Sequence, residues 1–176
     1  MTEATGFIVA RSLRASSLFV LAFTLGTSAV TAQDRLGGHF GVVFPLVTHV
    51  DGHTTTISDD FQIGFPTGIT VKTSGKVAFD LELVPSIQNN PLGVSLTVHP
   101  GILYALSSPW TAGLRMAFDV NAPSWGFTPL LNYGLPGAYH GLFVELVAPI
   151  RFQEARGAAV ERRTSIGLGA HIGIGF

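Results

Sequence analysis

The sequence predicts an all-β protein, an eight-stranded antiparallel up-and-down transmembrane β-barrel. The hydrophobic share of the chain is 47% and the charged share only 12%. Even so, no apolar run beyond the N-terminal region approaches the ~20 residues that a membrane-spanning helix needs. Apolar residues instead alternate with small or polar ones along eight segments, which is the periodicity of β-strands. The 21 glycines and 10 prolines favour frequent turns between these segments.

The N-terminal segment, residues 1–32, has the pattern of a secretory signal peptide. A short apolar core follows Arg11 and Arg14, and a stretch of small residues ends at Ala32. The alternative is an uncleaved membrane helix, for which the apolar core is too short. We therefore expect cleavage after Ala32, which leaves residues 33–176 as the barrel domain. The chain contains no cysteine, which excludes disulfides, thiolate metal sites and lipoprotein acylation.

The first four predicted strands span residues 38–50, 61–73, 76–87 and 92–106. Each places large apolar side chains on one face at period two, which predicts that this face contacts lipid. In chain order these outward residues are Phe40, Val42, Phe44 and Leu46; Phe61, Ile63, Phe65, Ile69 and Val71; Val77, Phe79, Leu81 and Leu83; and Leu92, Val94, Leu96, Val98 and Ile102.

The last four predicted strands span residues 110–121, 125–135, 139–152 and 164–176. Their outward residues are Trp110, Leu114, Met116 and Phe118; Trp125, Phe127, Leu131 and Tyr133; Leu142, Val144, Leu146, Ile150 and Phe152; and Ile166, Leu168, Ala170, Ile172, Ile174 and Phe176. The final strand is the most regular, and a soluble protein seldom ends on such a bare apolar edge. A strand of this kind is explained if it closes a barrel in a membrane.

The predicted connections alternate in length, as they do in membrane barrels. Short turns follow the second, fourth and sixth strands, whereas longer polar loops follow the first strand (residues 51–59) and the seventh (residues 153–163). Aromatic residues gather near both ends of the strands, where interfacial girdles lie. Six prolines fall inside predicted strands, and for five of them we expect bulges or frayed pairing toward the outer rim. These five are Pro45, Pro66, Pro85, Pro129 and Pro149, whereas the sixth, Pro100, lies near the middle of its strand and has no such explanation.

Every charge within a predicted strand lies on the inward register. Six of these residues are predicted to form a lumen charge network: Asp80, Glu82, Arg115, Asp119, Glu145 and Arg151. Counting residues up from the short turns places four of them, Asp80, Glu82, Arg115 and Glu145, at similar mid-barrel heights. Because an eight-stranded interior is just wide enough for side chains, a paired network that plugs the lumen is the first interpretation. A narrow ion or solute path is the alternative, since many inward positions are glycine.

The terminal strand resembles the C-terminal signal of bacterial outer-membrane β-barrels, with Ile172, Ile174 and Phe176 as the matching residues. The whole of residues 33–176 resembles the small barrels of the outer membrane protein A, X and W type. This resemblance implies a monomer in a Gram-negative outer membrane, in contact with its lipid and lipopolysaccharide. It also implies that the barrel-assembly machinery reads the last strand, and that the role is structural, surface interaction or small-solute passage.

Other functions have weaker support in the sequence. A lipid A-modifying enzyme of the deacylase type would need a His-x-Ser pair on a lipid-facing strand, and none occurs. His49, Asp51 and His53 form a weak metal-ligand pattern that a solvated loop explains better. The net charge of −1 does not indicate a nucleic-acid partner. A soluble lipocalin-like barrel would overfill its interior with this many large apolar residues. The sequence therefore predicts no catalytic residue, cofactor or metal.

Overall fold

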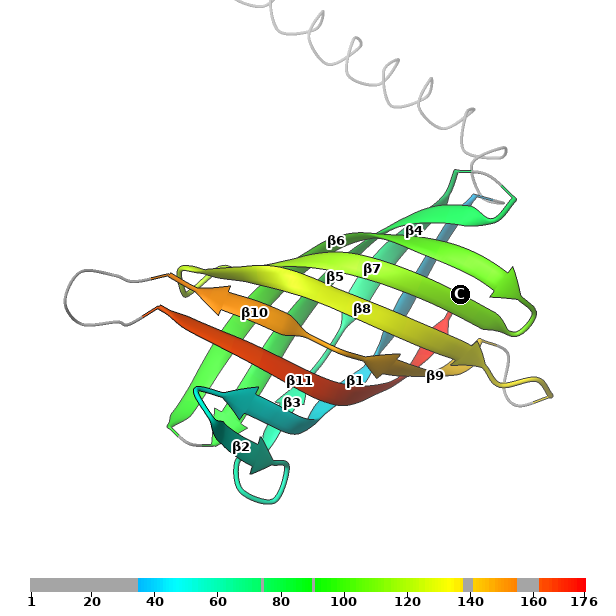
Figure 1. The fold of residues 1–176 in the computed structure, drawn as a ribbon. Helices are drawn as coiled ribbons and strands as arrows, with labels where there is room; N and C mark the ends of the chain where they lie inside the picture. Colours follow the sequence, from blue (N-terminus) through cyan, green and yellow to red (C-terminus); the bar gives the residue numbers. More distant parts are fainter. Residues whose placement is uncertain (1–34, 74, 90, 138–140, 155–161) are drawn as a thin grey trace, which may run out of the picture. The chain divides into compact units, whose positions relative to one another are not determined.

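The structure is a computed structural model, and it describes residues 35–73, 75–89, 91–137, 141–154 and 162–176. The elements in these ranges are all strands (Figure 1). They are β1 (Leu36–Val50), β2 (His53–Thr56), β3 (Gln62–Gly64), β4 (Thr67–Lys72), β5 (Val77–Asn89), β6 (Leu92–Ser107), β7 (Trp110–Asp119), β8 (Ser124–Gly134), β9 (Leu142–Val147), β10 (Ile150–Gln153) and β11 (Arg163–Gly175). Within the described ranges, no helix is long and apolar enough to cross a membrane.

The strands form one closed antiparallel barrel. Successive strands pair with one another, and β1 pairs with β11 from His39–Gly175 to Val50–Ser165, which closes the sheet. Eight strands make up the barrel wall, and two of them are interrupted. β3 and β4 are the two parts of the second barrel strand, and β9 and β10 are the two parts of the seventh. The predicted eight-stranded antiparallel up-and-down barrel is confirmed.

The two interrupted strands break at Pro66 and Pro149, and each of these prolines lies one register position away from a proline on the neighbouring strand. At the first break, between β3 and β4, the Phe65 amide donates to the Pro85 carbonyl at 2.8 Å, and Pro66 follows. At the other, between β9 and β10, the Ala148 amide donates to the Pro129 carbonyl at 2.9 Å, and Pro149 follows. Proline carbonyls therefore still pair although each proline lacks an amide hydrogen.

The remaining predicted irregularity lies at Pro45, where the register with β11 shifts before Val47. This confirms the expected bulge. Most of the predicted strand ends lie within two residues of those in the structure, but one predicted loop differs. Residues 51–59 were expected to be a polar loop, whereas β2 pairs with the end of β1 across an Asp51-Gly52 turn with positive φ at both residues. The predicted start of the seventh strand, residue 139, lies outside the described residues, and β9 begins at Leu142.

The pleat sorts side chains strictly between the outside and the lumen, as β5 illustrates. Phe79, Leu81 and Leu83 are 43%, 38% and 45% exposed on the outer face, whereas Asp80 and Glu82 are 0% and 3% exposed inside. The same alternation runs around the barrel and leaves large apolar side chains exposed on the outer surface. The lumen contains the buried polar and charged groups, and these are the candidates for a functional site.

Candidate functional site

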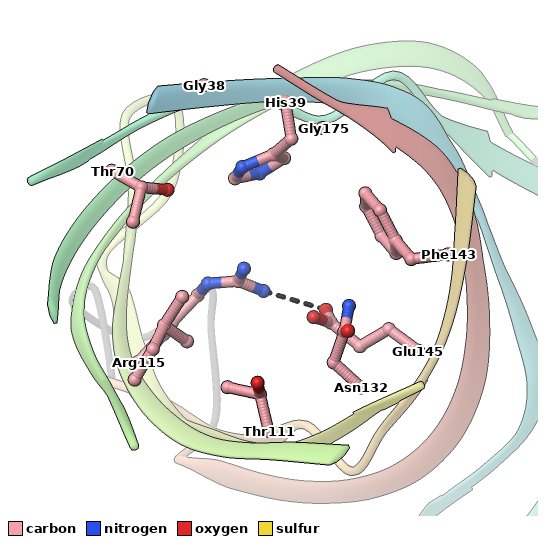
Figure 2. Close-up of a pocket in the computed structure, with 10 residues that line it drawn as sticks. Gly38, His39, Thr70, Thr111, Arg115, Asn132, Phe143, Glu145 and Gly175 are labelled. Carbon is pink, nitrogen blue, oxygen red and sulfur yellow. Dashed lines mark hydrogen bonds and ion pairs between the residues drawn. The ribbon is translucent and has the colours of Figure 1, made fainter. Parts of the chain in front are cut away.

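The centre of the lumen is occupied by Arg115 of β7, which contacts three carboxylates. Its Nε donates to Asp80 Oδ2 at 2.8 Å, and its Nη1 donates to Glu145 Oε1 at 2.9 Å. Glu82 Oε2 lies 3.4 Å from the same Nη1. Figure 2 shows Arg115 and Glu145 reaching toward each other from different parts of the barrel wall. The guanidinium thus links β5 to β9 across the lumen.

Three buried histidines surround these carboxylates. His39 Nε2 lies 2.9 Å from Glu82 Oε2, and His99 Nδ1 lies 3.0 Å from Glu82 Oε1. His171 Nδ1 lies 3.2 Å from Glu145 Oε1. We refer to the following residues as the lumen cluster: His39, Asp80, Glu82, His99, Arg115, Glu145 and His171.

The hydrogen bonds fix the tautomer of one histidine. Arg151 Nη2 lies 3.2 Å from His99 Nε2, and arginine can only donate. His99 Nε2 must therefore accept, so the ring is neutral and its Nδ1 carries the hydrogen that is donated to Glu82. This gives a continuous chain of donors and acceptors from Arg151 through His99 and Glu82 to Arg115.

Two cavities meet at the lumen cluster. The smaller, of about 160 Å³, lies toward the end of the barrel that carries the short turns and the C-terminus, and Figure 2 shows its lining. The larger, of about 870 Å³, extends from the cluster toward the opposite end, where β1 and β10 end and β11 begins. Arg115 and Glu145 line both cavities, so their ion pair forms the partition between them.

The six charges predicted for the lumen network do not all lie in the cluster. Asp80, Glu82, Arg115 and Glu145 are in mutual contact through Arg115. The other two lie higher in the large cavity. Arg151 reaches the cluster only through His99, and Asp119 accepts a hydrogen bond from Thr97 at 2.7 Å.

The three cluster histidines were expected to be inward lumen residues with satisfied hydrogen bonds, but they were not counted in the predicted charge network. Their inward register was readable from the sequence, because His39 and His171 alternate with outward apolar residues on β1 and β11. Their height was not readable, since it depends on the stagger between strands that pair at the barrel closure. In the structure Val43 pairs with His171, and His171 in turn pairs with Glu145.

The other candidate residues lie outside the lumen. Ile172 and Ile174 face outward, and Phe176 exchanges two backbone hydrogen bonds with Gly38 at 2.8 and 2.9 Å. The described residues include no group of three His, Cys, Asp or Glu side chains that could hold a metal ion. His49 instead bonds to the Thr54 hydroxyl at 2.9 Å.

Comparisons with known proteins show resemblance in architecture only. No protein-family model matches the sequence, and no curated protein matches it. Among solved structures, a barrel described under "De novo design of transmembrane beta-barrels" has a TM-score of 0.43 and 10% identity, covering 80% of this chain and 96% of the other. The outer membrane protein OprG from Pseudomonas aeruginosa has a TM-score of 0.41 and 13% identity, covering 80% and 94% respectively.

Proposed function

We propose that this chain is a non-enzymatic outer-membrane β-barrel whose lumen is closed at its middle by the lumen cluster. The observation that supports it best is the sorting of side chains, with apolar residues outside and the strand charges inside. A water-soluble protein rarely exposes a contiguous apolar patch of more than a few hundred Å². In a bilayer the same surface is favourable, whereas a charge facing mid-membrane would cost ~2–4 kcal/mol.

The proposed orientation places the short turns and the C-terminus in the periplasm. The opposite end, with Arg162 and Arg163, then faces outward, where basic side chains meet the phosphates of lipopolysaccharide. The barrel-assembly machinery would read β11 through Ile172, Ile174 and Phe176. The signal peptide proposed for residues 1–32 lies outside the described residues and would direct export.

The closed lumen follows from the geometry of Arg115. Arg115 is 2% exposed, and its guanidinium contacts side chains from β5 and β9, so a solute would have to displace buried ion pairs to pass. Breaking a buried pair is expensive, of order 3–5 kcal/mol. We therefore propose a structural or surface-interaction role for the resting protein.

A narrow pore is the second candidate, and one observation favours it. The side chains of Arg115 and Glu145 lie between the two cavities and line both. Rotamer changes in these two residues would join the cavities without any change in the backbone. Such a protein would pass small solutes in rare openings.

Single-channel conductance of the refolded barrel in a planar bilayer tests both candidates. We expect insertion with no conducting steps for the unmodified chain. Glu145→Gln, which weakens one contact of Arg115, should raise the frequency of openings, whereas Asp119→Asn, which lies outside the cluster, should not. Frequent steps from the unmodified chain would contradict the closed lumen. A chain that stays soluble and does not insert would contradict the membrane barrel itself.

A further inference from the structure

The large cavity contains an arginine that the closure of the lumen does not require. This cavity of about 870 Å³, here called the vestibule, runs from the lumen cluster toward the end where β10 ends and β11 begins. Arg151 of β10 lines it, above Arg115. The two lumen arginines have different surroundings, and this difference indicates a binding site.

Arg151 uses only part of its hydrogen-bonding capacity. Its Nη1 donates to Phe127 O at 3.1 Å, Thr128 Oγ1 at 3.0 Å and Ile150 O at 3.2 Å. Its Nη2 donates once, to His99 Nε2. A guanidinium has five N–H groups. The Nε hydrogen and one Nη2 hydrogen are therefore left without a partner among the described residues.

The positive charge of Arg151 also lacks a contacting counter-ion. Among the described residues, no carboxylate oxygen lies within 4.0 Å of it, whereas Arg115 has three such partners. Arg163, which lines the same vestibule, pairs with Asp51 at 3.4 Å. A partly buried cation without a counter-ion is unfavourable, and two free N–H groups on one guanidinium match the two oxygens of a carboxylate.

Asp119 limits which anions fit beside Arg151. It lines the vestibule, and its charge acts on Arg151 from more than 4.0 Å away. One of its oxygens accepts from the Thr97 hydroxyl, and the other has no hydrogen-bond partner among the described residues. This negative charge opposes a dianion more than a monoanion. The free oxygen can accept a hydrogen bond from a donor on the ligand.

We propose that the vestibule binds a small organic monocarboxylate with a hydrogen-bond donor on the neighbouring carbon. The carboxylate takes the two free hydrogens of Arg151, and the donor faces Asp119. Binding requires access only from the vestibule side, so the site goes beyond the proposed function and does not depend on passage through the lumen cluster. A conducting barrel would leave this inference intact.

The test follows the Arg151 Nε–H signal by NMR in the barrel refolded into lipid nanodiscs. Glycolate is the probe, and sodium chloride keeps the ionic strength constant. We expect a saturable shift of this signal. Arg151→Gln should weaken glycolate binding, followed on neighbouring amides, by about tenfold or more, since it removes a charge-assisted pair. Arg151→Lys keeps the positive charge but loses the planar pair of N–H donors, and it should also weaken glycolate binding.

Matched controls make the outcome decisive. Arg163→Gln removes a cation from the same vestibule that is already paired, and it should change the affinity by less than about twofold. Phosphate at pH 8 should bind more weakly than glycolate. Asp119→Asn should reduce this difference in affinity between the two anions. Equal losses in Arg163→Gln and Arg151→Lys, tighter binding of phosphate than glycolate, or an identical saturable shift with chloride alone would each overturn the proposal.

Discussion

Replacing Arg115 with glutamine should destabilise the barrel more than any other single lumen substitution. The change leaves Asp80, Glu82 and Glu145 buried with no guanidinium between them. Removing one partner of a buried ion pair costs about 3–5 kcal/mol. Because a domain of this size is stable by only ~5–15 kcal/mol, this loss is a large fraction of the total free energy of unfolding. The loss should shrink at low pH, since protonated carboxyls need no cation.

Urea unfolding in lipid vesicles, followed by the fluorescence of Trp110 and Trp125, measures this loss. The double variant Arg115→Gln with Glu145→Gln separates the ion pair from simple packing. The double variant should lose less free energy of unfolding than the two single variants lose in sum, by about 0.5–3 kcal/mol. Lys72→Gln on exposed β4 is the control and should stay within about 0.5 kcal/mol of the parent. An Arg115→Gln loss below about 1 kcal/mol, or strict additivity, would refute the idea that the cluster holds the barrel together.

Two further predictions concern the barrel wall. Ile172→Asp places a charge on the outer face of β11 and should lower the yield of heat-modifiable barrel, whereas Thr164→Asp, near the other end of the same strand, should have little effect because the cost depends on membrane depth. Normal yields of the Ile172→Asp barrel would argue against lipid contact at that position. Gly126→Ala should destabilise the barrel by about 1–3 kcal/mol, because the added Cβ meets the Ile150 backbone carbonyl. Gly93→Ala is the control, since its added Cβ has room. Equal urea midpoints for the two variants would contradict this close approach of β8 and β10.

The strands and their faces could be predicted because each requires only period-two alternation. Leu81 and Glu82 are adjacent in sequence but face the outside and the lumen respectively, so one apolar position fixes the whole face of a strand. The turn at Asp51-Gly52 was also present in the sequence, since this dipeptide favours a two-residue hairpin. The residues that follow, His53–Thr56, are all polar and exposed, so no alternation of apolar and polar residues marks them as a strand.

The interruptions between β3 and β4 and between β9 and β10 could not be predicted from single prolines. Pro66 and Pro85 lie in different strands, and their effects combine because the register sets them at adjacent positions of one ladder. The same holds for Pro129 and Pro149. The sequence indicates where an amide hydrogen is missing, but the stagger of the strands decides which neighbour lies across from it.

The stagger also explains why two inward arginines have different environments. Arg115 pairs with Gly101 and Thr128, at the height where β5 and β9 present three carboxylates, and it becomes the partition of the lumen. Arg151 pairs with Gly126 and Ser165, on the vestibule side of that height, and meets carbonyls, a hydroxyl and a histidine. Residue type and inward register are identical for the two. Because the two arginines differ in height along the barrel, Arg115 is held in buried ion pairs, whereas Arg151 keeps charge and N–H donors available to a ligand. Substitutions at the two positions should therefore have different effects. Arg115 should govern the stability of the barrel and the closure of the lumen, and Arg151 should govern anion binding.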